Sequence, residues 1–127
     1  MAAKSRPTSA DLVPAIRDAW SVAIRIGSKP HRFIRIWAVV VAGRVYARSW
    51  SLTTGGWYKT LAAEKRGVLQ VGRKTAPFRG VRARGEALRS AVDRAYLRKY
   101  VRPSEARYAR DLCEARSRTT TVELRLE

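Results

Sequence analysis

The sequence predicts a mainly β protein with added α-helices (α+β), folded as a split, mostly antiparallel β-barrel with helices packed outside it. Alternating or continuous apolar runs follow one another over short, glycine-containing turns. Such turns favour hairpins over the long crossovers that a parallel sheet needs. Helical periodicity separates these runs, so after a short N-terminal helix we expect the order β-β-β-α-β-β-α-α-β.

The length indicates a single domain. A chain of 127 residues, of which 46% are hydrophobic, can bury one core but not two comfortable ones. We expect an N-terminal extension over residues 1–20, with a short helix between Asp11 and Trp20, followed by one split-barrel domain over residues 21–127.

The first strands are predicted by their alternation. Val22–Ile26 alternates apolar and polar side chains, as a half-buried strand does. Phe33–Ala42 is predicted as a second strand, and its continuous apolar part indicates burial on both faces, with something packed outside the barrel. A tight turn at Ala42-Gly43-Arg44 then leads into the returning strand Val45–Trp50. That strand places Val45 and Ala47 on one face and Tyr46, Arg48 and Trp50 on the other.

The second half is predicted to hold more helix. The remaining expected elements are a helix over Trp57–Arg66 ended by Gly67, strands over Val68–Val71 and Pro77–Ala83, a helix over Glu86–Tyr100, a further helix capped by Ser104 with Tyr108, Leu112 and Ala115 on its apolar side, and a terminal strand over Thr119–Leu126.

The charge is strongly unbalanced. The net charge is +17. The segment between Ser21 and Val81 contains twelve Lys and Arg residues but only one carboxylate, Glu64. A small sheet domain of this kind repels itself, and an anionic partner relieves the repulsion. A phosphate-bearing cofactor, a nucleic acid and a membrane surface are the three candidate partners, and the first is favoured.

Several classes of protein are excluded. Cys113 is the only cysteine and His31 the only histidine, so an intrachain disulfide and the usual zinc-ligand spacings are absent. The longest apolar run, Ile36–Ala42, is too short to span a bilayer, and the N-terminus lacks the apolar core of a signal peptide. We therefore expect a cytoplasmic protein with no membrane span.

The candidate binding site lies around the loop 49–56. A strand delivers Arg48 and Ser49 to its end, and a loop of small and hydroxyl residues leads to a helix that starts near Trp57. Helix N-termini and fixed cations bind anions, so Arg48, Ser49 and Lys59 are predicted to hold a phosphate. Trp50, Trp57 and Tyr58 are predicted to line a planar ring, as in a flavin. Ordinary packing of the aromatic residues and ordinary turn chemistry of the hydroxyls remain the alternative.

A family resemblance rests on several short stretches. They are Ile36-Trp37, Val45 to Ser49, Gly56-Trp57-Tyr58 with Leu61, Gly72, Asp93 to Tyr100 and the terminal Thr-rich strand. Nearly the whole chain after residue 20 resembles a bacterial family, domain of unknown function 2255. That family is distantly similar to the deazaflavin-dependent nitroreductases and to the flavin-binding split barrels related to pyridoxamine 5′-phosphate oxidase.

The resemblance implies a homodimeric split barrel that holds FMN or a deazaflavin in a groove, with redox activity of the nitroreductase type. The Trp57-Tyr58 pair and Leu61 match the nitroreductase pattern. Thr60 stands where that pattern has Asn, and Glu64-Lys65 stand where it has Asn-Pro. The protein of such enzymes orients a cofactor that does the chemistry, so catalytic residues stay unassigned.

Two other functions remain open. The basic helices over residues 86–100 and 104–115 can mimic a helix-turn-helix, although five carboxylates interrupt their basic face. Basic residues on the sheet with an exposed Trp50 or Tyr46 can instead stack single-stranded bases. A structural dimer module without a cofactor is the third possibility.

Overall fold

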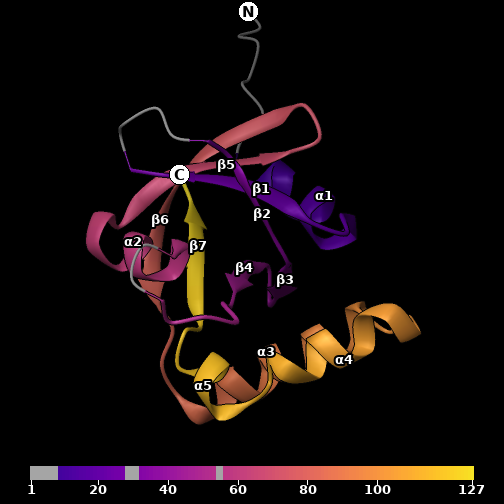
Figure 1. Ribbon diagram of the computed structural model, residues 1–127. Helices are drawn as coiled ribbons and strands as arrows, with labels where there is room; N and C mark the ends of the chain where they lie inside the picture. Colours follow the sequence, from indigo (N-terminus) through magenta and orange to yellow (C-terminus); the bar gives the residue numbers. More distant parts are fainter. Residues whose placement is uncertain (1–8, 28–31, 54–55) are drawn as a thin grey trace, which may run out of the picture.

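The structure is a computed structural model that describes residues 9–27, 32–53 and 56–127. A 3₁₀ turn at Ser9–Leu12 precedes the elements labelled in Figure 1. These are α1 (Val13–Asp18), β1 (Val22–Ile26), β2 (Ile34–Ile36), β3 (Ala38–Val41), β4 (Arg44–Ala47), α2 (Trp57–Glu64), β5 (Arg66–Val71), β6 (Lys74–Arg82), α3 (Glu86–Lys99), α4 (Pro103–Asp111), α5 (Ala115–Arg118) and β7 (Val122–Leu126).

The strands form one antiparallel sheet that nearly closes into a barrel. Their spatial order is β2-β1-β5-β6-β7-β4-β3, and every neighbouring pair is antiparallel. The strands at the two ends of this order, β2 and β3, are separated in the chain by Trp37 alone. The sheet must therefore curl until its two edges meet at that residue. The predicted fold class, an α+β split barrel, is confirmed.

The predicted strand Phe33–Ala42 is two strands, and this corrects the sequence analysis. Before Trp37 the chain pairs with β1, where Ile36 lies opposite Val22. After Trp37 it pairs with β4, where Ala38 lies opposite Ala47. Hydrophobic periodicity shows that a segment is extended and buried, but it carries no information on a change of pairing partner.

The burial predicted for β3 on both faces is confirmed for Ala38 and Val39, whereas Val40 and Val41 are partly buried, and β4 is also covered on both faces. Ala38, Val45 and Ala47 belong to the core inside the barrel, together with Ile16, Ile24, Leu69, Phe78 and Leu124. Val39 and Tyr46 point the other way, into a second core beneath α3 and α4 that also holds Trp37, Val92, Tyr96, Tyr100 and Leu112. These two strands therefore form the wall between two hydrophobic cores.

Several element boundaries differ from the prediction. The strand expected to run to Trp50 ends at Ala47, and the terminal strand begins at Val122 instead of Thr119. Helix α2 ends before Lys65, which adopts a left-handed conformation with φ of 68°, whereas Gly67 already belongs to β5. The sequence analysis ended the helix at Gly67 because glycine commonly adopts the left-handed conformation after a helix. In the structure Lys65 takes this conformation, and the chain enters β5 at Arg66.

The helices cover different parts of the barrel (Figure 1). Helix α1 packs against β3 and β4, and α2 packs against β1, β5 and β6, while α3, α4 and α5 lie together across the far side of β3 and β4. Leu12 and Ile16, from the segment expected as an extension, are buried in the barrel core. No helix among the described residues is long and apolar enough to cross a membrane.

Lys99 ties the helix layer to the barrel. Its Nζ donates to the carbonyl oxygens of Ile16 in α1, at 3.1 Å, and of Ala38 in β3, at 2.7 Å. Burial lowers the pKa of this amine to about 8. When Lys99 is deprotonated, its amine keeps two N–H donors, and the Ile16 and Ala38 carbonyls can accept both.

We predict that Lys99 makes folding more favourable as the pH rises from 8 to 10. The unfolded chain, with a Lys pKa near 10.5, binds more protons in this interval than the folded protein does. Lys99→Met should remove this increase, which we expect to be about 1 kcal/mol after allowance for partial solvent exposure.

The measurement is urea unfolding of wild type and variant at pH values across this interval. Lys59→Met, which changes an exposed lysine on α2, is the matched control and should follow wild type. Parallel pH profiles for wild type and Lys99→Met would contradict the prediction.

Candidate functional site

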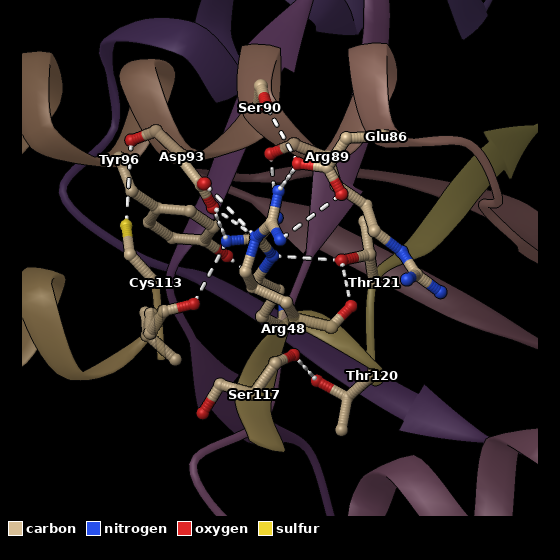
Figure 2. A network of polar contacts seen from close by, with 12 residues as sticks. Arg48, Glu86, Arg89, Ser90, Asp93, Tyr96, Cys113, Ser117, Thr120 and Thr121 are labelled. Carbon is tan, nitrogen blue, oxygen red and sulfur yellow. Dashed lines mark hydrogen bonds and ion pairs between the residues drawn. The ribbon is translucent and has the colours of Figure 1, made fainter. Parts of the chain in front are cut away.

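Arg48 is the centre of a buried polar network (Figure 2). Its residue is 1% exposed, and its guanidinium contacts four other residues. Nε donates to Thr121 Oγ1 at 2.8 Å, and Nη2 donates to the Arg89 carbonyl at 2.9 Å. Nη1 forms an ion pair with Asp93 and donates to the Leu112 carbonyl at 2.9 Å. This guanidinium joins the end of β4 to α3, the end of α4 and the start of β7.

Asp93 lies between two arginines. Besides Arg48 it contacts Arg118, whose Nε is 3.1 Å from the second carboxylate oxygen. Arg118 also holds Glu86, with Nη2 at 2.6 Å from a carboxylate oxygen. Hydrogen bonding to Arg118 lowers the pKa of Glu86, and the same bond raises the pKa of Arg118. The network thus continues to the protein surface as alternating charges.

Tyr96 and Cys113 complete the network without offering a reactive group. The Tyr96 hydroxyl donates to the Trp37 carbonyl at 2.7 Å and accepts from the Arg48 amide at 3.0 Å. Burial raises the pKa of Tyr96, and burial followed by the charge of Asp93 raises the pKa of Cys113. A thiol with a raised pKa is a poor nucleophile, so Cys113 is a packing residue here.

The hydroxyl residues of the predicted phosphate loop bond to the protein itself. The Ser49 amide donates to Thr120 Oγ1 at 2.8 Å, and the Ser49 hydroxyl donates to the Ser51 carbonyl at 2.7 Å. The Ser51 and Thr53 hydroxyls are hydrogen bonded to one another. Residues 54–55 lie outside the described part of the chain. The described hydroxyls therefore stabilise the turn.

The other predicted site residues lie in separate places. Trp50 is 38% exposed and its indole donates to the Tyr108 carbonyl at 3.1 Å, on the side of α4. Trp57 packs against the barrel core. Tyr58 is half-buried at the start of α2, and Lys59 is exposed. The structure does not assemble Arg48, Ser49, Trp50, Trp57, Tyr58 and Lys59 into one pocket, and their role in cofactor binding stays a prediction.

A groove of about 420 Å³ lies between α2, β6 and the start of β7. It is lined by Tyr58, Leu61, Ala62, Lys65, Gly80, Val81, Arg82 and Val122. Three of these residues, Tyr58, Leu61 and Ala62, follow the spacing i, i+3, i+4 and share one face of α2, and Lys65 directly follows the helix as its C-cap. Sequence reasoning found Tyr58 but missed Lys65 and Arg82, because only the packing of α2 against β6 brings Arg82 beside this helix.

A larger pocket of about 710 Å³ lies beside α4 and α5. It is lined by Trp37, Trp50, Tyr108, Asp111, Glu114, Arg116 and Ser117. Tyr108 was expected on the apolar side of its helix, but it is 44% exposed, which corrects that expectation. Helix α4 ends at Asp111, earlier than the predicted helix over residues 104–115, and the residues that it buries are Glu105 and Ala109. No group of metal-binding side chains occurs among residues 9–27, 32–53 and 56–127.

The model of domain of unknown function 2255, described as an uncharacterised protein conserved in bacteria, matches residues 15–124. The chain belongs to this family. The match begins in α1 and ends in β7, so it includes all the residues that line the groove and the larger pocket. No curated protein matches the chain.

We predict that Arg48 is required for stability. Arg48→Met removes the guanidinium donor from the Leu112 and Arg89 carbonyls and one of the two arginines paired with Asp93. Breaking a buried ion pair costs about 3 to 5 kcal/mol of unfolding free energy, and the remaining pair of Asp93 with Arg118 places the expected cost at the lower end of this range. Arg44→Met changes an exposed arginine at the start of β4, the strand that Arg48 directly follows, and should cost less than about 1 kcal/mol.

Guanidinium chloride unfolding of both variants measures these costs. A near-wild-type stability for Arg48→Met, combined with loss of phosphate-ligand binding, would instead support the binding role that the sequence suggested for Arg48.

Proposed function

We propose that this protein binds a phosphorylated flavin or deazaflavin in the groove between α2, β6 and β7. The observation that carries the proposal is the combination of side chains around the groove. An aromatic ring, an apolar floor and two cations line it, and none of its lining residues is a carboxylate. Ligand pockets of this kind are mainly apolar, with a few polar groups that fix orientation.

The floor of the groove suits a planar ring system. Leu61 is buried at 2% exposure, and it lies so close to β6 that a Cβ on Gly80 would come within 2.7 Å of its side chain. The absence of a side chain at Gly80 therefore lets α2 approach the sheet. Tyr58 stands at one end of this apolar floor, where its ring can contact the edge or face of a flavin.

The cations suit a phosphate. Lys65 and Arg82 are both exposed and both line the groove. They take the role that the sequence analysis gave to Arg48 and Lys59. Arginine binds phosphate through two parallel N–H bonds, and lysine adds a point charge.

The walls of the groove are held in place by the backbone. The Gly80 amide donates to the Lys65 carbonyl at 2.9 Å, which fixes the end of α2 to β6. The Tyr58 hydroxyl lies 3.4 Å from the Thr119 carbonyl, just before β7. A groove whose walls are fixed before binding loses less entropy when a ligand enters.

A bound flavin or deazaflavin supplies hydride chemistry, and the chain's residues would bind and orient it. We therefore propose an oxidoreductase of the nitroreductase type and assign no acid–base residue. A homodimer, which the family resemblance implied, remains part of this proposal.

The test is a titration of the purified protein with FMN, riboflavin and a phosphorylated deazaflavin, followed by ligand fluorescence. We expect FMN to bind at least tenfold more tightly than riboflavin, because only FMN carries the phosphate. Lys65→Gln combined with Arg82→Gln should remove that preference and leave riboflavin binding nearly unchanged.

Two further variants make the test specific. Ala62→Trp should fill the groove and weaken both flavins, whereas Arg79→Gln, an exposed arginine of β6 that does not line the groove, should bind like wild type. The proposal fails if wild type binds none of the ligands, or if Ala62→Trp leaves their affinity unchanged. Salt-dependent binding of oligonucleotides without flavin binding would favour the nucleic-acid alternative.

A further inference from the structure

We infer that the larger pocket, beside α4 and α5, binds an organic cation, namely a quaternary or methylated ammonium group. This site is separate from the proposed flavin groove and does not depend on it. Three aromatic side chains and two carboxylates line the pocket, against a single arginine. In a chain with a net charge of +17, this is an unusual local reversal of sign.

The aromatic rings stand nearly perpendicular to one another. The Trp37 and Trp50 rings meet at 69° with centroids 5.4 Å apart, and the Trp50 and Tyr108 rings meet at 87° with centroids 6.5 Å apart. Rings at right angles form adjacent walls of a box. An ammonium group inside such a box contacts the negative faces of more than one ring, which is how aromatic cages bind methylated ammonium groups.

Neighbouring residues hold the Trp37 and Trp50 rings in place. Trp37 is 9% exposed and is stacked on Tyr100 with centroids 3.9 Å apart and an interplanar angle of 4°. The indole of Trp50 is held by its hydrogen bond to the Tyr108 carbonyl. The box is therefore preformed. Its outer walls, Trp50 and Tyr108, are partly exposed, and the Arg107 guanidinium lies over the Tyr108 ring, 5.0 Å from its centroid, so this ring already contacts a cation in the structure.

The two carboxylates of the pocket, Asp111 and Glu114, have no salt-bridge partner among the described residues. Glu86, Asp93 and Glu123 are each paired with arginine in the same structure. Arg116 lines the pocket with Asp111 and Glu114 yet forms no salt bridge with either. Two carboxylates that form no salt bridge within the described part of the chain, beside three aromatic rings, attract a cation.

The same features disfavour the other ligand classes. An anion would be repelled by two carboxylates. A neutral flat ring needs one exposed aromatic face and gains nothing from perpendicular walls or from negative charge. A compact cation with methyl groups fits the aromatic rings, their perpendicular arrangement and the carboxylates, because its methyl groups contact more than one ring and its charge lies near the carboxylates.

The test is calorimetric titration of the intact chain with tetramethylammonium, choline and 3,3-dimethylbutanol at constant ionic strength. The last compound has the shape of choline without its charge. We expect both ammonium probes to bind at least tenfold more tightly than the neutral alcohol, with quenching of tryptophan fluorescence.

Variants assign the binding to this pocket. Trp50→Leu should abolish ammonium binding, and Asp111→Asn combined with Glu114→Gln should weaken it about tenfold. Asp18→Asn, which changes an exposed carboxylate of α1 outside the pocket, is the matched control and should bind like wild type. Circular dichroism of each variant shows whether it is folded. Equal affinity for choline and the neutral alcohol, or unchanged affinity in the double carboxylate variant, would overturn the inference.

A peptide with trimethyllysine distinguishes two sources of the cation. Binding at least tenfold tighter than choline would indicate a methylated protein, and equal binding would indicate a free small molecule. Either result supports the ammonium site, while failure of the peptide and of both small ammonium probes contradicts it. Flavin titrations are independent of these results, because no residue lines both pockets.

Discussion

The buried guanidinium of Arg48 is the contact on which the arrangement of barrel and helices depends. Taking an arginine out of water is costly unless its charge is paired and its N–H groups are hydrogen bonded. Asp93 supplies the charge, and carbonyls from α3 and the end of α4 accept hydrogen bonds. Because these partners come from separate elements, the helix layer can take only a position that satisfies Arg48.

This constraint also shapes both pockets. Arg48 bonds to Thr121 and Ser49 bonds to Thr120, so the segment between α5 and β7 is held against the end of β4. Ser117, on one side of that segment, lines the aromatic pocket, and Val122, on the other side, lines the groove beside α2. One anchored segment thus separates a cationic groove from a pocket rich in aromatic and acidic side chains.

Much of the fold could be predicted because its signals are local. The alternation along β4 and the residue after it correctly placed Tyr46 and Arg48 on the face opposite Val45 and Ala47. The same alternation could have predicted that Arg48 is buried, because Arg48 shares a face with Tyr46 and α3 covers that face. The break at Trp37 could not be predicted, because neighbouring strands leave the same hydrophobic pattern whether or not the pairing partner changes.

The sequence by itself determined the antiparallel sheet, the main helices, the charge excess and the membership of a bacterial family. Each of these depends on residue type and on short-range periodicity. Only the tertiary structure decided which cations face a cavity and which are buried, because the side-chain partners of Arg48 lie 41 to 73 residues away in the chain. Contacts at such separations depend on how the sheet closes, and no local pattern encodes that closure.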